Sequence, residues 1–389
     1  MFKPKISICI PTYNREKYLD WQLSQFLNFK DKISDWEFVI SNNGSSDNTK
    51  EIIDKYRTDL KINYHEFSSN VGAEINTKKA LSLANSDLVT YLADDDFLNV
   101  DVINAYLNLF NESPKLSAIF APGQYLDAVD YKTGPDWYSL DEDVIIPQKD
   151  YLSTIELILN NNIFPELFIV KKNIAESFFS VNNIIFEYFT WCAQIVSSGN
   201  VIFAKHPFYA LITRHPADQD KPRAQNGNII LQTAWDRYKG GFELILGLAR
   251  LQNKIEEYKI IKLLNQLNNF VLDRMVYACR SNLFAGNFLS GYWLYLRIVA
   301  NIGKFNLNEE LNFDNILGLA TIEYVLQVSI LNKVHLGEEI NQPIRLLANK
   351  FSPNRFFLKK GDLPTINLYS KDPSILISYQ DSLQKLNFL

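Results

Sequence analysis

Three consecutive acidic residues follow an apolar run in the N-terminal part of the chain. The run, Leu88–Leu92, is β-branched and aromatic and follows the turn-forming pair Asn85-Ser86, which predicts a buried strand. The carboxylates of Asp94–Asp96 repel one another, so they need either a solvated turn or a cation that holds them together. Hard divalent cations such as Mg²⁺ and Mn²⁺ prefer carboxylate oxygens. The triplet alone therefore leaves two interpretations open, a metal site and an exposed turn before a helix that begins near Asn99.

The segments before this triplet alternate between strand and helix patterns. The predicted strands are Lys5–Ile10, Glu37–Ile40 and Ile62–Glu66, and the predicted helices cover residues 16–29, 48–56 and 73–84. This alternation with short connections predicts a mainly parallel, doubly wound α/β sheet. Ligands of such sheets bind outside the carboxyl ends of the strands. Polar clusters follow three predicted strands, at Thr12–Arg15, Ser41–Asp47 and Asp94–Asp96, and this convergence favours a nucleotide-type ligand with a metal.

Length and charge narrow the class of protein. A chain of 389 residues is longer than one core usually serves, so we expect two domains, 1–225 and 226–389, joined through the polar, proline-containing stretch 217–227. The net charge of −5 gives no basic excess, so nucleic acid is not an expected partner.

Cysteine usage and hydropathy bear on the compartment. The three cysteines are scattered and lack metal-ligand spacing, which indicates a reducing compartment without disulfides. The N-terminus shows no signal-peptide pattern. The apolar windows 284–302 and 313–331 contain charged residues, so they are expected to be buried or interfacial helices. We expect a cytoplasmic protein, with peripheral contact to the inner face of the cytoplasmic membrane left open.

Four motifs resemble those of the family 2 glycosyltransferases, which have the GT-A fold. Ser7–Arg15 resembles the first strand and loop of that family, and Ser41–Asp47 resembles its acidic-acidic-Gly-Ser-x-Asp element. Asn70-x-Gly72 resembles its Asn-x-Gly element, and Leu92–Asp96 resembles its metal-binding Asp-x-Asp element. The resemblance implies an inverting transferase that uses a nucleotide-sugar and a divalent cation, Mn²⁺ or Mg²⁺.

The resemblance also implies a donor nucleotide site. Its residues would be Pro11, Thr12, Tyr13, Asn14, Asn43, Asn70, Gly72, Asn76, Asp94 and Arg214. Tyr13 would stack on the base, since an aromatic ring at a strand end offers contact area at low entropic cost; the alternative is packing under the loop. Arg214 would contact the diphosphate.

The second loop departs from the family pattern at the position that reads the base. Asn42 and Asn43 stand where the family usually has an aspartate that accepts a hydrogen bond from uracil. An asparagine still offers its carbonyl oxygen but carries no charge. A UDP-sugar is therefore the favoured donor, with dTDP and GDP left open, and Asp47 is expected to cap the following helix rather than to contact ligand.

The acidic element also departs from the usual form, because Ala93 stands where the first aspartate is expected. The resemblance then makes Asp95 the direct metal ligand and places Asp94 at the ribose hydroxyls. Asp96 would contact metal-bound water or the acceptor. His215 is a candidate third metal ligand or phosphate contact, with a solvated loop histidine as the alternative.

A general base must take the proton from the acceptor hydroxyl. The family places an acid pair at the start of a helix that ends with a glycine, and here the matching helix would end at Gly199. Glu187 matches the first acid and is the predicted base, whereas Tyr188 stands at the second position. Alternatively, Glu187 pairs with a lysine or caps the helix.

Beyond residue 228 the pattern becomes helical. The predicted helices are Trp235–Leu251, Lys254–Ser281, Phe288–Ile302 and Phe313–Leu331, and the tail Thr365–Tyr379 is expected to form a short strand or two. Basic and aromatic residues here suit either a lipid-linked acceptor at a membrane surface or ordinary packing and a homo-oligomer interface.

By family analogy, the acceptor would be a hydroxyl of a surface glycan, such as lipopolysaccharide or capsule, or of a lipid-linked oligosaccharide. Two other functions stay open at this point: a nucleotidyltransferase, and a non-catalytic glycan- or partner-binding protein on a degenerate transferase fold.

Overall fold

The protein is described here from a computed structural model. The described residues are 3–178, 187–217, 235–252, 255–303, 307–309, 311–328, 334–336, 342–352, 356–357 and 366–368. The chain divides into two compact units, one of residues 1–223 and 237–267 and the other of residues 224–236 and 268–389. The predicted boundary at residue 225 stays a prediction.

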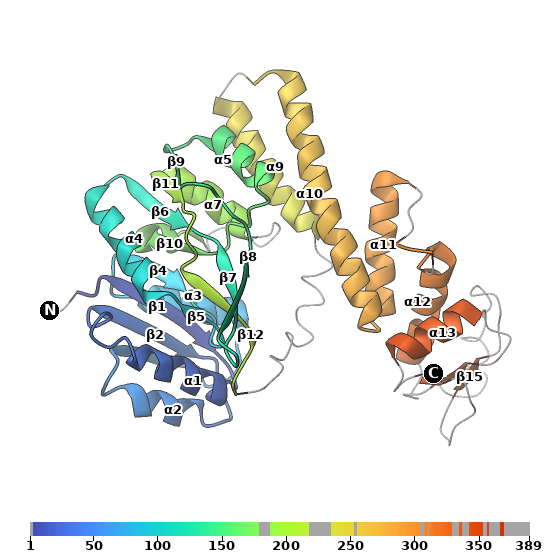
Figure 1. Cartoon of the computed structure of the whole chain (residues 1–389), viewed down its shortest axis with the longest axis horizontal. Helices are drawn as coiled ribbons and strands as arrows, with labels where there is room; N and C mark the ends of the chain where they lie inside the picture. The colour runs from blue at the N-terminus through green and yellow to red at the C-terminus, as the bar shows by residue number, and fades with distance from the viewer. Residues whose placement is uncertain are drawn as a thin grey trace. The chain divides into compact units, whose positions relative to one another are not determined.

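An eight-stranded sheet forms the centre of the first unit (Figure 1). Its strands are β1 Ile6–Thr12, β2 Trp36–Asn42, β3 Ile62–Glu66, β4 Leu88–Tyr91, β6 Leu116–Phe120, β9 Val144–Ile146, β10 Phe168–Lys171 and β11 Asn200–Phe203. Their order is β3-β2-β1-β4-β10-β6-β11-β9. Strands β1 to β4 are parallel, whereas β10 runs antiparallel to β4 and β6, and β9 runs antiparallel to β11. The predicted mainly parallel α/β sheet is confirmed.

Helices follow most of these strands. They are α1 Glu16–Leu27, α2 Thr49–Tyr56, α3 Ala73–Leu83, α4 Val100–Glu112, α5 Tyr151–Asn160, α6 Lys172–Ala175, α7 Glu187–Ser198, α9 Trp235–Gln252 and α10 Glu257–Phe284. Strand β2 is buried along its whole length, as expected for a parallel strand covered on both faces. Phe26 of α1 packs on Phe38 of β2 with ring centroids 4.8 Å apart.

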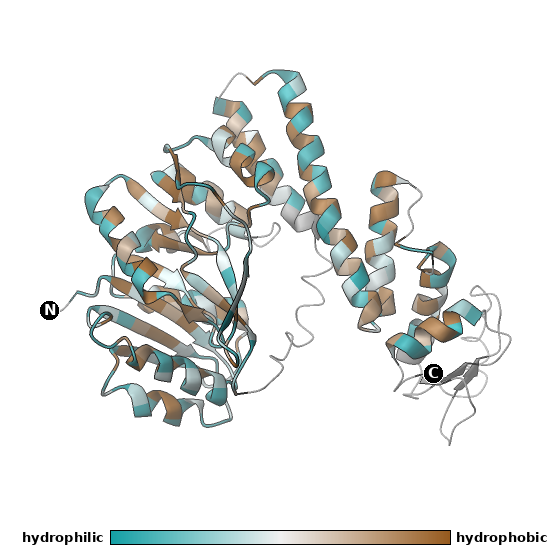
Figure 2. Ribbon diagram, in the orientation of Figure 1, coloured by the Kyte–Doolittle hydropathy of each residue, from teal (hydrophilic) through white to brown (hydrophobic). Residues whose placement is uncertain are grey.

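Helix α9 belongs to the first unit from Arg237 onward. Phe242 of α9 packs on Phe189 of α7 at 4.0 Å between ring centroids. Figure 2 shows hydrophobic and hydrophilic residues alternating along α9 and α10, the pattern of helices that bury one stripe. The first part of α10 also joins this unit, since Lys259 forms a 2.8 Å ion pair with Glu156 of α5.

A second sheet of four strands lies in the same unit. Its strands are β5 Phe97–Leu98, β7 Gly123–Asp127, β8 Lys132–Asp136 and β12 Tyr209–Arg214, in the order β5-β12-β7-β8. Residues 124–149 are largely polar and contain two prolines, a pattern that predicts irregular structure; this prediction is wrong, because β7, β8 and β9 lie there. Pro135 argues against a strand because proline has no N–H to donate. However, β8 lies at the edge of its sheet, where a missing N–H is tolerated. The apolar run Val201–Ala204 predicts a final strand of this domain, but β12 follows β11, so β11 is not the last strand.

The second unit contains the end of α10, three further described helices and a small sheet. The helices are α11 Phe288–Ile302, α12 Phe313–Val328 and α13 Gln342–Phe351, and the strands are β13 Val334–Leu336, β14 Phe356–Phe357 and β15 Ile366–Leu368. Buried Glu323 of α12 accepts a 2.7 Å hydrogen bond from the Leu289 backbone N–H, in the first turn of α11. One strand of the predicted tail, β15, is present, and residues 369–379 lie outside the described residues. Among the helices that the structure describes, none has the length and apolar character needed to cross a bilayer.

Candidate active site

The carboxyl ends of β1, β2 and β4 lie at one edge of the large sheet. Thr12 at the end of β1 is paired with Asn42 at the end of β2, and β4 runs parallel to β1 on its other side. The loops that follow these strands are therefore neighbours. The predicted convergence of the three polar clusters is confirmed.

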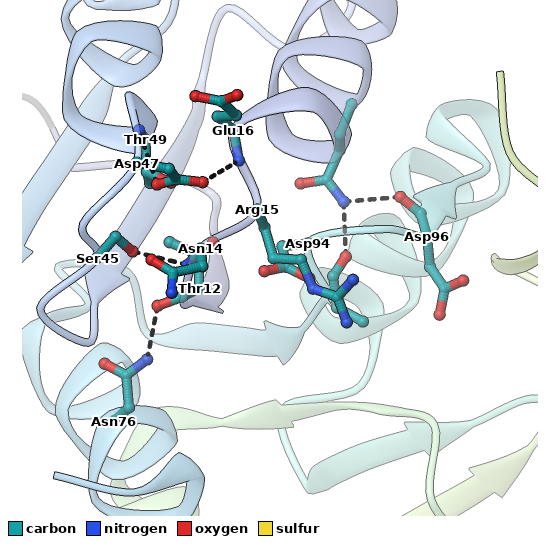
Figure 3. A network of polar contacts seen from close by, with 12 residues as sticks. Thr12, Asn14, Arg15, Glu16, Ser45, Asp47, Thr49, Asn76, Asp94 and Asp96 are labelled. Carbon is teal, nitrogen blue, oxygen red and sulfur yellow. Dashed lines mark hydrogen bonds and ion pairs between the residues drawn. The ribbon is translucent and has the colours of Figure 1, made fainter. Parts of the chain in front are cut away.

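Asn14 joins the first loop to the second (Figure 3). Its backbone N–H donates to Ser45 Oγ at 2.9 Å, and its Oδ1 accepts from the Ser46 backbone N–H at 2.8 Å. The backbone φ of Asn14 is 52°, a left-handed conformation that asparagine adopts more readily than most residues.

Hydrogen bonds to the carboxylates of Asp47 and Glu16 connect the starts of α1 and α2. Asp47 Oδ2 accepts from the Glu16 N–H at 3.0 Å, and its Oδ1 accepts from the Thr49 N–H at 3.1 Å. In return, Glu16 Oε2 accepts from the Asn48 N–H at 2.9 Å. The helix-capping role predicted for Asp47 is confirmed, and the same carboxylate also serves the helix before it.

The asparagines of the second loop are buried and hydrogen-bonded. Asn42 Oδ1 accepts from the Ser45 N–H at 3.0 Å. Asn43 Nδ2 donates to Asn70 Oδ1 at 3.0 Å, and Asn43 Oδ1 accepts from the Val71 N–H at 2.8 Å. Asn43 therefore ties the second loop to the Asn-x-Gly loop, and a direct contact to a base stays a prediction.

The three acids of the triplet are almost fully buried, at 9%, 8% and 5% exposed for Asp94, Asp95 and Asp96. Their burial rules out the exposed-turn interpretation. The segment forms a turn in which the Asp96 N–H donates to the Ala93 carbonyl at 3.2 Å.

The side chain of Arg15 lies beside this turn. Its Nε lies 4.0 Å from Asp94 Oδ1, and its guanidinium lies over the Tyr18 ring, 5.0 Å from the centroid. Burial, followed by the charge of Asp95, raises the pKa of Asp94 to about 7, whereas the Thr12 hydroxyl and Arg15 act in the opposite direction. Arg15 belongs to the first sequence motif, but the sequence alone predicts no role for it, because only folding brings its side chain close to Asp94.

Residues 7–178 match the family model described as glycosyl transferase family 2. This domain is a family 2 glycosyltransferase domain. The resemblance inferred from the four motifs is therefore confirmed, and with it the GT-A type of α/β fold.

Curated relatives match shorter stretches. Abequosyltransferase RfbV of Salmonella typhimurium is 39% identical over 109 residues, which are 26% of this chain and 32% of that protein. GalNAc(5)-diNAcBac-PP-undecaprenol beta-1,3-glucosyltransferase of Campylobacter jejuni is 29% identical over 116 residues, 28% of this chain and 35% of that protein. The chain thus spans about a third of each of these relatives. Among solved structures, S. aureus TarS 1–349 in complex with UDP-GlcNAc is 14% identical, with a TM-score of 0.49 over 90% of this chain and 93% of that one.

Four further residues predicted for the donor site lie at or after the carboxyl ends of β1 and β3, or on the helix that follows β3. Tyr13 is 42% exposed, as a base-stacking ring would need to be. Asn76 on α3 donates from Nδ2 to the Thr12 carbonyl at 3.4 Å (Figure 3). Its Oδ1 is buried and accepts no hydrogen bond from the described part of the chain. Pro11 lies in β1, next to the last residue of that strand, and Gly72 lies at φ 92° directly before α3.

Arg214 is the last residue of β12, and His215 follows it directly. Arg214 Nη1 pairs with Asp127 at 2.8 Å and with Asp130 at 2.7 Å. These ion pairs count against a role at the diphosphate, which stays a prediction. His215 is fully buried, with its ring 4.6 Å from that of Tyr18, and its Nδ1 accepts from the backbone N–H two residues on.

The metal and base assignments of the transferase domain stay predictions. Within the described ranges, no group of three or more His, Cys, Asp or Glu side chains is arranged to hold a metal ion. Glu187 is the first residue of α7, as expected for the acid at a helix start. Its side chain lies outside the described part of the structure.

Proposed function

We propose that this protein is a metal-dependent, inverting glycosyltransferase. It would move a sugar from a nucleotide-sugar to a hydroxyl of a surface glycan or a lipid-linked oligosaccharide. The observation that carries the proposal is the pair of buried carboxylates, Asp94 and Asp95, at the carboxyl end of β4 in a family 2 domain. They stand beside the loops after β1 and β2, where nucleotides bind to such sheets.

The donor would lie across these loops. Exposed Tyr13 offers a face for the base, and the buried Asn76 Oδ1 offers an acceptor for a ribose or base N–H or O–H. A UDP-sugar is the favoured donor. For the acceptor, the Campylobacter relative is named as a glucosyltransferase acting on GalNAc(5)-diNAcBac-PP-undecaprenol, and this supports a lipid-linked acceptor here.

The donor set fits a hard divalent cation. Asp94 and Asp95 are adjacent buried carboxylates, and such oxygens suit Mn²⁺ or Mg²⁺. We assign Asp95 as the direct ligand and Asp94 to the ribose hydroxyls. When bound, the cation would neutralise the charge that develops on the departing nucleoside diphosphate.

Glu187 would act as the general base. It would accept the proton of the acceptor hydroxyl while the acceptor oxygen attacks the anomeric carbon from the face opposite the leaving group. Its place at the first residue of α7 supports this role.

The Asp95→Ala variant tests the site. Because it removes the proposed cation ligand, we expect release of nucleotide from a panel of UDP-, dTDP-, GDP- and CDP-sugars to fall by about a hundredfold or more in the presence of Mn²⁺. Asp101→Ala is the matched control, since this exposed carboxylate pairs with Lys32 on the surface. Unchanged metal-dependent turnover in Asp95→Ala would overturn the assignment.

A second arm of the same experiment separates transfer from binding. Glu187→Gln should lose transfer while still binding UDP with Mn²⁺ in calorimetry. If the unmodified protein binds no nucleotide at all, the non-catalytic alternative is favoured over a transferase.

A further inference from the structure

The acidic turn, residues 93–96, is held by a glutamine that precedes it by more than seventy residues. Gln22 of α1 is fully buried. Its Nε2 donates to the Ala93 carbonyl at 2.6 Å and to the Asp96 carbonyl at 2.7 Å. A side-chain amide has two N–H donors, so this single group binds both ends of the turn.

A tyrosine holds the turn from the other sheet. Tyr209 of β12 is 3% exposed. Its hydroxyl accepts from the Ala93 N–H at 3.0 Å and donates to Asp96 Oδ2 at 3.1 Å. The Ile212 backbone N–H donates to Asp96 Oδ1 at 2.9 Å, so β12 contacts both carboxylate oxygens of Asp96.

These contacts divide the triplet into two parts. Asp96 is engaged by β12 through its side chain and by α1 through its carbonyl. In Figure 3 its carboxylate points away from Asp94, which lies beside Arg15. Gln22, Tyr209 and Ile212 form these hydrogen bonds with Ala93 or Asp96. Asp94 and Asp95 lie between these two anchored residues.

We propose that Gln22 and Tyr209 are positioning residues that set the acidic turn so that Asp94 and Asp95 are prearranged for the cation and the donor. Asp96 belongs to this anchoring set. The inference rests on the proposed function, because it takes Asp94 and Asp95 as the ligand-binding carboxylates.

The physical reason is the repulsion within the triplet. Adjacent carboxylates in a buried turn favour any rearrangement that separates them. Buried backbone groups without partners would add the cost of desolvation. Donors fixed on α1 and β12 offset both costs, and ligand groups held in place before binding are the more effective ones.

Two variants remove the proposed anchors with little change in volume. Tyr209→Phe removes only the bridging hydroxyl, and Gln22→Met removes the amide donors from a side chain of similar length. The matched controls are Tyr106→Phe and Gln25→Met. Tyr106 is a buried tyrosine whose hydroxyl donates to the His206 carbonyl at 2.6 Å, and Gln25 lies on the same helix as Gln22.

The first measurement needs no metal. Hydrogen–deuterium exchange of peptides that cover residues 91–98 should be faster in Tyr209→Phe and Gln22→Met than in either control, since the Ala93 N–H loses its acceptor or its turn loses its donors. Unchanged exchange in both variants would overturn the inference whatever the protein binds.

The second measurement is calorimetric titration of Mn²⁺ in the presence of UDP. We expect affinity for Mn²⁺ to fall about tenfold in each anchor variant and UDP binding to recover at excess Mn²⁺. The two control variants should bind Mn²⁺ as tightly as the unmodified protein does, even if their melting temperatures fall as much as those of the anchor variants. Anchor variants that bind like the controls overturn the positioning role, whereas no Mn²⁺–UDP binding by the unmodified protein overturns the proposed function itself.

Discussion

Glu37 is a buried carboxylate at the opposite end of the large sheet from the acidic turn. It is 7% exposed and accepts from Ser7 Oγ at 2.5 Å, from the Asn85 N–H at 2.9 Å and from Asn85 Nδ2 at 2.5 Å. Asn63 Nδ2 adds a longer contact at 3.4 Å. One side chain thus joins β1, β2, β3 and the loop before β4, and hydrogen bonds to a charged acceptor are stronger than neutral ones.

Glu37→Ala is expected to lower the free energy of unfolding by about 3 kcal/mol, because it leaves several buried donors without an acceptor. Urea denaturation followed by circular dichroism measures the change. Glu51→Ala, at an exposed position of α2, is the control and should change it by less than about 0.5 kcal/mol. Equal midpoints for the two variants would contradict the role given to Glu37.

Among single residues, the sequence predicts those that lie at strand ends, but it does not predict the residues that hold them in place. Asp94–Asp96 could be placed because a buried strand precedes them directly. Arg15, Gln22 and Tyr209 could not, since their contacts join segments separated by about 70 to 120 positions along the chain. The sequence around a single buried glutamine or tyrosine does not show whether its side chain holds a functional turn in place or only fills the core.

Helices α1 and α2 share their N-terminal hydrogen bonds. Each helix start has N–H groups that no residue of its own helix can satisfy. Here Asp47 serves both helices, and Glu16 of α1 returns a contact to Asn48 before α2. The loops after β1 and β2 are consequently held together at the starts of the two helices.

Asp47→Ala should therefore destabilise the protein by about 2 kcal/mol, the upper range for the loss of one helix cap. Glu16→Ala should cost less, and the double variant should cost less than the sum, because both carboxylates join the same two loops. Chemical denaturation of the three variants gives the coupling. Asp54→Ala, an exposed partner of Lys50, is the near-neutral control; strict additivity of the two loop variants would refute the shared role.

Whole elements were predictable where their signals are local. Helix α11 lies at its predicted bounds, with Gly303 at φ 79° directly after it. Strand β12 was missed because it pairs with β7 and β5, and only that tertiary pairing defines it.

The whole molecule keeps its three thiols buried. Cys9 and Cys192 lie in the first unit and Cys279 in the second. Burial raises the pKa of Cys9 and Cys192 well above the usual range and that of Cys279 to about 12. A pKa raised by folding stabilises the folded state below the pKa of the unfolded thiol, near 8.5, and this contribution is lost as the pH rises above that value.

The native protein should accordingly resist a thiol reagent at pH 8, since the thiolate is the reactive form. Along a urea gradient, with labelling read by peptide mass spectrometry, Cys9 and Cys192 should become reactive at one common midpoint, while Cys279 reports the second unit. Reaction of Cys9 in the absence of urea, or separate midpoints for Cys9 and Cys192, would contradict this description of the first unit.

The anchoring of the acidic turn has a consequence for mutational tolerance. At Ala93, both Gln22 and Tyr209 bind main-chain atoms, the carbonyl oxygen and the N–H, and neither needs the methyl group. A substitution at this half-buried position therefore leaves both main-chain hydrogen bonds available. A saturation library at residue 93, screened against different nucleotide-sugars, would alter the surface next to Asp94 without dismantling its support, which makes this position a practical starting point for changing donor preference.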